Sequence, residues 1–119
     1  APPVQLASTA AWNDEAHVLD NRNQYREKFA ACTPLIGEVL GTRMPDASFY
    51  LWARTPVTDT EFARGLLEHY NVVVLPGSFL AREVKDINPG ANFVRIALVA
   101  SAAECLDAAS RIRRFAQQL

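Results

Sequence analysis

Residues 93–99 read Phe93-Val94-Arg95-Ile96-Ala97-Leu98-Val99, an apolar stretch with a single arginine inside it. Such a composition is typical of a mostly buried β-strand. Because side chains alternate along a strand, Val94, Ile96 and Leu98 share one face, and Arg95 lies on the other. If the first face packs against helices, Arg95 points to the uncovered side. A guanidinium there requires an anion or solvent, and its planar fork suits a carboxylate.

Three helices are predicted around this strand. The first spans residues 14–40, where apolar side chains recur every three or four positions, with a kink or break at Thr33-Pro34 and a stop at Gly41. The second begins at Thr58 and the third at Ser101. In each case a hydroxyl residue is followed three positions later by glutamate, which is the pattern of a capping box.

Two further strands are predicted, an aromatic one over residues 48–53 and a β-branched one over residues 72–75. Residues 78–92 form a long loop, and Gly77 and Gly90, each preceded by proline, are expected to have positive φ. The order of elements is helix, strand, helix, strand, strand, helix. It predicts an α+β two-layer sandwich, with a small mixed sheet of about three strands and helices on one face.

Composition excludes two classes of partner. The 119 residues carry 12 basic and 13 acidic side chains, which leaves no field to attract nucleic acid, and no apolar run approaches the length of a membrane span. His17 and His69 lack partners at metal-ligand spacing, so no metal site is predicted. Cys32 and Cys105 lie on apolar helical stripes, which indicates reduced core thiols and fits a cytoplasmic protein.

Several stretches carry a family resemblance: Pro3-Val4-Gln5-Leu6-Ala7, Ala11-Trp12, Asn21-Arg22, Tyr25-Arg26-Glu27-Lys28-Phe29, Val74-Leu75-Pro76-Gly77-Ser78, Asn88-Pro89-Gly90 and Val94-Arg95-Ile96-Ala97-Leu98-Val99. Together they resemble the C-terminal small domain of fold-type I, pyridoxal-phosphate (PLP)-dependent aminotransferases of class I/II. Three others look most like bacterial N-succinyldiaminopimelate aminotransferases of lysine biosynthesis: Ser48-Phe49-Tyr50-Leu51-Trp52-Ala53, Leu80-Ala81-Arg82 and Ala97-Leu98-Val99-Ala100. The resemblance implies that residues 14–119 form the small domain and that residues 1–13 end a large-domain segment or a linker.

The resemblance also assigns roles to individual residues. It implies that Arg95 binds the α-carboxylate shared by amino-acid and 2-oxo-acid substrates. Arg82 is a candidate for binding a distal carboxylate or a succinyl group, and Tyr50 and Trp52 are candidates for lining the substrate pocket. The alternatives are a salt bridge from Arg95 to a neighbouring acid, a solvated loop arginine at position 82, and two aromatics that act only as core or interface anchors.

In this family a lysine of the large domain binds PLP. The chain has only Lys28 and Lys85, and neither matches the family's lysine motif. We therefore expect no catalytic and no cofactor-binding residue in this chain. PLP is expected to bind to the large domain of a parent enzyme that is a homodimer, and this chain alone is expected to be inactive.

The parent reaction implied is amino transfer between glutamate and a substrate of the N-succinyl-2-amino-6-oxopimelate type. One alternative is another fold-type I enzyme, such as a C–S lyase, an oxoamine synthase or an aminotransferase of different specificity. A second alternative is a stand-alone module that binds a carboxylate or a partner without catalysing a reaction.

Overall fold

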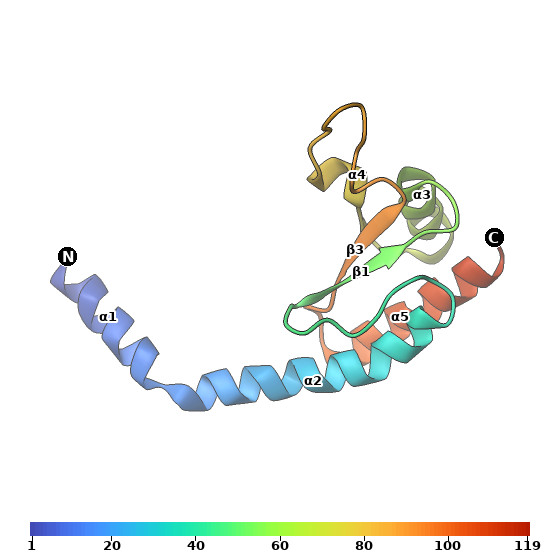
Figure 1. The fold of residues 1–119 in the computed structure, drawn as a ribbon. Helices are drawn as coiled ribbons and strands as arrows, with labels where there is room; N and C mark the ends of the chain where they lie inside the picture. Colours follow the sequence, from blue (N-terminus) through green and yellow to red (C-terminus); the bar gives the residue numbers. More distant parts are fainter.

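The computed structural model describes all residues 1–119, which form five helices and three strands (Figure 1). In chain order these are α1 (Pro2–Asn13), α2 (Glu15–Gly37), β1 (Tyr50–Arg54), α3 (Asp59–Tyr70), β2 (Leu75–Pro76), α4 (Gly77–Leu80), β3 (Phe93–Ala97) and α5 (Ala102–Gln117). This is the predicted α+β fold. None of the helices combines the length and the apolar character needed to cross a membrane.

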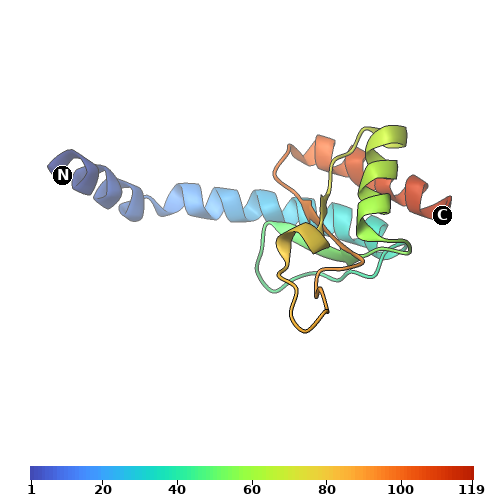
Figure 2. The same ribbon diagram turned by 90° about the horizontal axis from the view of Figure 1, so that it is seen from above.

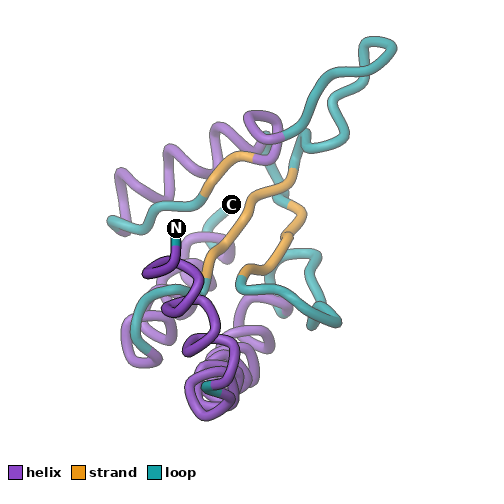
Figure 3. Tube along the Cα trace, turned by 90° about the vertical axis from the view of Figure 1, so that its left-hand side faces the viewer, coloured by secondary structure: helices purple, strands orange, loops and turns teal.

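The three strands form one sheet in the order β1-β3-β2 and lie side by side in Figure 3. Both pairings of β3 are antiparallel, and they place Arg95 opposite Trp52 of β1 and Leu75 of β2. The prediction of a mixed sheet is therefore wrong in this detail. β3 inserts between β1 and β2, which run in the same direction but are not neighbours, and such long-range pairing cannot be inferred from element order.

Helices α2, α3 and α5 pack on one face of the sheet, and the other face is open except at one end, where α4 lies over it (Figures 1 and 2). The core between the layers holds apolar side chains of these helices and of β1 and β3: Phe29, Cys32, Ile36, Leu51, Ala53, Phe62, Leu66, Val94, Ile96, Cys105, Ala109, Ile112 and Phe115. On β3, Val94 and Ile96 are buried while Arg95 is half-buried on the opposite face. The predicted alternation along this strand is confirmed.

Helix α1 differs from the other long helices because none of its residues is buried. It extends away from the sheet together with the first turns of α2 (Figures 1 and 2). Val4, Leu6 and Trp12 are exposed along it. The stability of the domain therefore comes from the part of the chain that follows this arm.

Three local predictions are wrong. The helix predicted to break at Thr33-Pro34 continues through Pro34 to Gly37; Ala30, whose carbonyl loses its partner at the proline, is exposed, so water can hydrate it. Gly41 does not end the helix but pairs with Arg54. Residues 72–74 are not strand, because only the two residues of β2 have partners in β3.

Cys32 and Cys105 are buried free thiols, as predicted. Burial, reinforced by the nearby Cys105 side chain, raises the pKa of Cys32 to about 11. A thiol with such a pKa stays protonated at neutral pH and is a poor nucleophile. Both cysteines therefore contribute as small apolar core residues.

Gly77 and Gly90 allow two segments of backbone to touch, one directly after β2 and the other just before β3. A Cβ on Gly77 would lie 2.3 Å from the Gly90 carbonyl oxygen and 2.7 Å from the Trp52 ring, and one on Gly90 would lie 2.1 Å from the Gly77 carbonyl oxygen. The expectation of positive φ is wrong, since no glycine of the chain has it. These glycines are required because a side chain has no space, and not because of their backbone conformation.

Substituting Gly77 by alanine should therefore destabilise the domain by about 1–3 kcal/mol or more, because backbone atoms must move to admit the methyl group. Urea unfolding followed by circular dichroism measures the free energy of unfolding. Gly37→Ala is the matched control: its Cβ would meet only the Thr42 carbonyl oxygen at 3.6 Å, an ordinary contact, and should leave stability unchanged or slightly raised. Equal stability of the two variants would contradict the close approach of residues 77 and 90.

Candidate functional site on the open face of the sheet

Arg95 lies at the centre of the open face, on the middle strand and flanked by a strand on each side. Its guanidinium carbon is 5.6 Å from the centroid of the Tyr50 ring, a distance at which a cation and an aromatic ring attract each other. The three ion pairs of the structure all involve other residues. The alternative in which Arg95 is neutralised by a neighbouring acid does not occur within this chain, and its hydrogen-bond donors remain available to an anion.

An aromatic pair lies beside Arg95 on the same face. The rings of Trp52 and Phe93 stack with centroids 5.4 Å apart and planes 9° from parallel. The guanidinium carbon of Arg54 lies 4.9 Å from the centroid of the same Phe93 ring. Sequence reasoning identifies neither Phe93 nor Arg54 as a site residue. The alternation of side chains along each strand would have been enough to find them. Phe93 is two positions from Arg95 on β3, and Arg54 is two positions from Trp52 on β1, so each lies on the same face as its neighbour.

A hollow of about 580 Å³ adjoins this cluster at the β1 edge. Tyr50 and Trp52 line it, together with residues of the preceding loop that include Thr42 and Arg43. The Thr42 hydroxyl donates a hydrogen bond to the Trp52 carbonyl at 3.0 Å, which holds this loop against β1. The structure thus brings Tyr50, Trp52 and Arg95 together, and two of them border a space of ligand size.

Arg82 is not part of this cluster. It is exposed and follows α4 in the loop that projects from the body of the domain (Figure 1). Its guanidinium takes part in none of the ion pairs and in none of the cation–ring contacts of the structure. Its role as a substrate contact stays a prediction.

Asp59 organises the segment that carries α4 and the start of β3, although sequence reasoning does not identify it. Its buried carboxylate accepts hydrogen bonds from the Ser78 N–H at 2.9 Å and the Asn92 N–H at 3.3 Å. Burial alone would raise the pKa of this carboxyl, but the hydrogen bonds from Ser78 and Asn92 outweigh it and hold the pKa below its ordinary value. In the sequence, Asp59 follows the capping residue Thr58. There it cannot be distinguished from the acidic residues that are common in the first turn of any helix.

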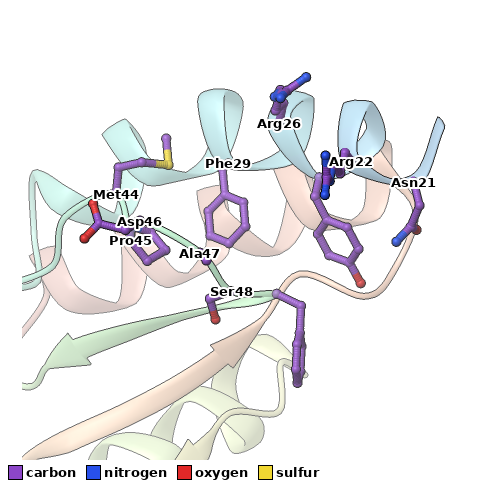
Figure 4. Close-up of a pocket in the computed structure, with 11 residues that line it drawn as sticks. Asn21, Arg22, Arg26, Phe29, Met44, Pro45, Asp46, Ala47 and Ser48 are labelled. Atoms are coloured by element: carbon purple, nitrogen blue, oxygen red, sulfur yellow. The ribbon is translucent and has the colours of Figure 1, made fainter. Parts of the chain in front are cut away.

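A separate groove of about 690 Å³ lies between α2 and residues 44–49 (Figure 4). The Phe29 ring points from α2 toward Ala47 and Ser48, whereas Arg26 points away from the groove. None of the four predicted site residues lines it. The structure also holds no cluster of three or more His, Cys, Asp or Glu side chains that could bind a metal ion.

The antiparallel sheet with one helical layer, and an unpaired arginine on the open face of its middle strand, agree with the small domain of an aminotransferase. Residues 2–112 match the family described as aminotransferase class I and II. Because the match covers nearly all of the chain, the protein belongs to this family.

Solved and curated relatives point the same way. The crystal structure of an aminotransferase from Neisseria meningitidis Z2491 is 51% identical, with a TM-score of 0.88 over 92% of this chain and 28% of that one. A probable N-succinyldiaminopimelate aminotransferase from Thermus thermophilus is 35% identical, with a TM-score of 0.73 over 90% of this chain and 28% of that one. An LL-diaminopimelate aminotransferase from Nitratidesulfovibrio vulgaris Hildenborough is 38% identical over 93% of this chain and 28% of its own length. The chain thus spans less than a third of these relatives.

The residues of this chain do not fit PLP. The Lys28 Nζ is buried on the helical side of the sheet, where it donates a hydrogen bond to the Leu98 carbonyl at 3.2 Å and lies 4.9 Å from the centroid of the Tyr25 ring. Lys85 is exposed in the projecting loop. The Lys28 amine thus lies on the helical side of the sheet, opposite Arg95, and the exposed Lys85 lies in a loop outside the sheet.

Asp59→Asn should destabilise the domain by about 1–3 kcal/mol at pH 7, because an amide cannot accept both backbone hydrogen bonds as a carboxylate does.

The size of this destabilisation depends on pH. A carboxyl whose pKa is lowered in the folded state stabilises the fold above its ordinary pKa of 3.8, and this contribution is lost as the pH falls through the lowered value. Urea unfolding over the acid range from about pH 2.5 to neutral should show a shallower loss of stability in the variant. Asp46→Asn, at an exposed loop position, should keep the slope of the unmodified chain. An unchanged slope in Asp59→Asn would contradict the role of Asp59.

Incubation of the chain with PLP, followed by borohydride reduction and peptide mass mapping, should label Lys85 and not Lys28. The Lys28 amine is buried and hydrogen-bonded, whereas that of Lys85 is exposed. Both lysines should react once the chain is unfolded in urea, which controls for detection of the Lys28 peptide. A stoichiometric adduct at Lys28 in the folded chain would show that a cofactor site exists here after all.

Proposed function

We propose that this chain is the substrate-binding small domain of a PLP-dependent aminotransferase, in which Arg95 binds the α-carboxylate common to the amino donor and the 2-oxo-acid acceptor. The observation that carries the proposal is the half-buried, unpaired Arg95 guanidinium on the open face of the middle strand. Membership in the aminotransferase family supports it. A charge left without a partner in a sheet is costly unless an anion binds to it.

The geometry suits the task of orienting a substrate. A guanidinium can hold a carboxylate through two parallel hydrogen bonds, which fixes the direction of the substrate as well as its position. The Tyr50 ring beneath Arg95 limits the movement of the guanidinium. Amino transfer requires that one bond at the substrate α-carbon keep a defined orientation, and a fixed carboxylate anchor provides that orientation. Tyr50, Trp52 and Arg82 stay predictions as further substrate contacts.

For the substrates, we propose glutamate and an acceptor of the N-succinyl-2-amino-6-oxopimelate type, as in lysine and diaminopimelate biosynthesis. The names of the Thermus and Nitratidesulfovibrio relatives, both of which refer to diaminopimelate compounds, support this choice. An aminotransferase of different specificity, or another fold-type I enzyme, shares the arginine and remains the alternative.

The cofactor and its lysine belong, in this proposal, to a large domain of the same enzyme, which acts as a homodimer. The fully exposed α1 helix and the open sheet face are the surfaces available to such a domain. A cytoplasmic location is proposed because Cys32 and Cys105 are free thiols. One other candidate function is a module that binds carboxylates and catalyses no reaction. It is favoured by the positions of Lys28, which is buried on the helical side, and of Lys85, which is exposed in a loop.

In the full-length enzyme, Arg95→Ala should lower kcat/KM for both amino donor and acceptor by about 2–4 kcal/mol of transition-state stabilisation, or roughly 30- to 900-fold. Both substrates lose the same carboxylate anchor. Arg64→Ala on α3, an arginine of the helical layer away from the open face, should leave both values unchanged. Equal kcat/KM in Arg95→Ala and the parent enzyme would remove the proposed role. A longer protein that binds carboxylates but transfers no amino group would favour the binding module.

A further inference from the structure

The open face carries a second unpaired arginine, Arg54, whose side chain takes part in none of the ion pairs or hydrogen bonds of the structure. Arg54 is exposed at the end of β1, and its guanidinium carbon lies 4.9 Å from the centroid of the Phe93 ring. All three ion pairs involve other cations, namely His17, Arg111 and Arg113. The face that holds Arg95 therefore presents two cations and no acid from β1 or β3.

The register of β1 and β3 fixes how the two arginines are arranged. Arg54 is opposite Phe93, and Trp52 is opposite Arg95, so Arg54 and Arg95 are diagonal neighbours on one face. Such neighbours are roughly 7–8 Å apart at the backbone. The two side chains then point toward different ends of the sheet. Arg95 lies over Tyr50 at one end, and Arg54 lies over Phe93 at the other end.

The stacked rings of Trp52 and Phe93 lie on the same face as the two arginines, and in the register of the strands Trp52 is opposite Arg95 while Phe93 is opposite Arg54. Trp52 is held in place on its far side, because its ring reaches the backbone of Gly77. The face thus carries two cations, each over an aromatic ring, and a pair of stacked rings beside them. A ligand that matches this pattern has two carboxylates joined by a hydrocarbon chain that is long enough to reach both arginines.

We propose that Arg54 and Arg95 form a receptor for a dicarboxylate, in which Arg95 binds the α-carboxylate and Arg54 binds the distal carboxylate while the chain of the ligand crosses the Trp52 and Phe93 rings. The inference rests on the proposed function, because it takes the ligand of Arg95 to be a substrate carboxylate. It assigns the distal carboxylate to Arg54 in place of Arg82. Arg54 is thus a specificity-determining residue that favours acidic, long-chain substrates.

Heptanedioate and heptanoate test this inference as a matched pair, because they have the same chain length and differ only in the second carboxylate. The probe is the Nε–Hε resonance of each arginine in the ¹⁵N-labelled chain, titrated at low ionic strength, where weak charge interactions are least screened. Heptanedioate should shift the resonances of both Arg54 and Arg95, whereas heptanoate should shift only Arg95. The second contact should tighten binding of the diacid by about two- to fivefold, as expected for an exposed ion pair.

Variants separate the roles. Arg54→Gln should reduce heptanedioate affinity to that of heptanoate and leave heptanoate binding unchanged, and Arg54→Lys should retain part of the gain. Arg64→Gln, which removes the same charge elsewhere, should leave both affinities unchanged, and Arg82→Gln tests the rival assignment of the distal carboxylate. Backbone amide spectra show whether each variant is folded, and the unmodified chain alone already reports on Arg54.

The outcomes distinguish the two proposals. If Arg95 responds to both ligands but Arg54 does not respond to the diacid, the dicarboxylate receptor is wrong and the proposed function stands. The same conclusion follows if Arg82→Gln, and not Arg54→Gln, removes the preference for the diacid. If neither arginine responds to either ligand, Arg95 is not a carboxylate receptor, and both proposals are overturned.

Discussion

The buried carboxylate of Asp59 joins three segments that are far apart in the sequence. It belongs to the first turn of α3, and it accepts hydrogen bonds from the backbone of Ser78 and of Asn92. These contacts hold the start of α4 and the residue before β3 at one point, where Gly77 and Gly90 touch through their backbones. A carboxylate at a helix N-terminus is also favoured by the helix dipole. The positions of α4 and of the start of β3 relative to α3, and hence one end of the open face, depend on this junction.

The junction also restrains one of the functional side chains, Trp52. Because the Trp52 ring fits between the Phe93 ring and the Gly77 backbone, it has little freedom to turn. Arg54 and Arg95 are in turn placed over the Phe93 and Tyr50 rings. A receptor whose side chains are already held in position loses less conformational entropy on binding, so more of the interaction free energy contributes to affinity. Rigidity at the open face therefore follows from packing at the sheet end and not from the charged groups themselves.

The sequence predicts the parts of this structure that depend on local pattern. Alternation along residues 93–99 places Arg95 on the open face, and the capping patterns locate the starts of α3 and α5, where Thr58 and Ser101 accept hydrogen bonds as expected. The parts that depend on long-range contacts could not be predicted in this way. Three features cannot be recognised from the residues next to them in the sequence: the central position of β3, the hydrogen bonds of Asp59 to distant backbone, and the lack of space at Gly77. The same holds for Arg54, since its partner Phe93 is identified only once the register of β1 and β3 is known.

The two faces of the sheet have separate tasks, and this separation explains why an arginine can occupy the middle of an otherwise apolar strand. The helical face buries Val94 and Ile96, and this burial stabilises the fold through the hydrophobic effect. The open face carries unpaired arginines and partly exposed rings, an arrangement that adds little to stability and has a cost in desolvated charge. Alternation allows one strand to do both, because residues next to each other in sequence point to opposite sides. Substitutions on the open face are thus free to change the ligand that is bound without altering the core, which makes this face the natural place for specificity to vary among relatives that share the fold.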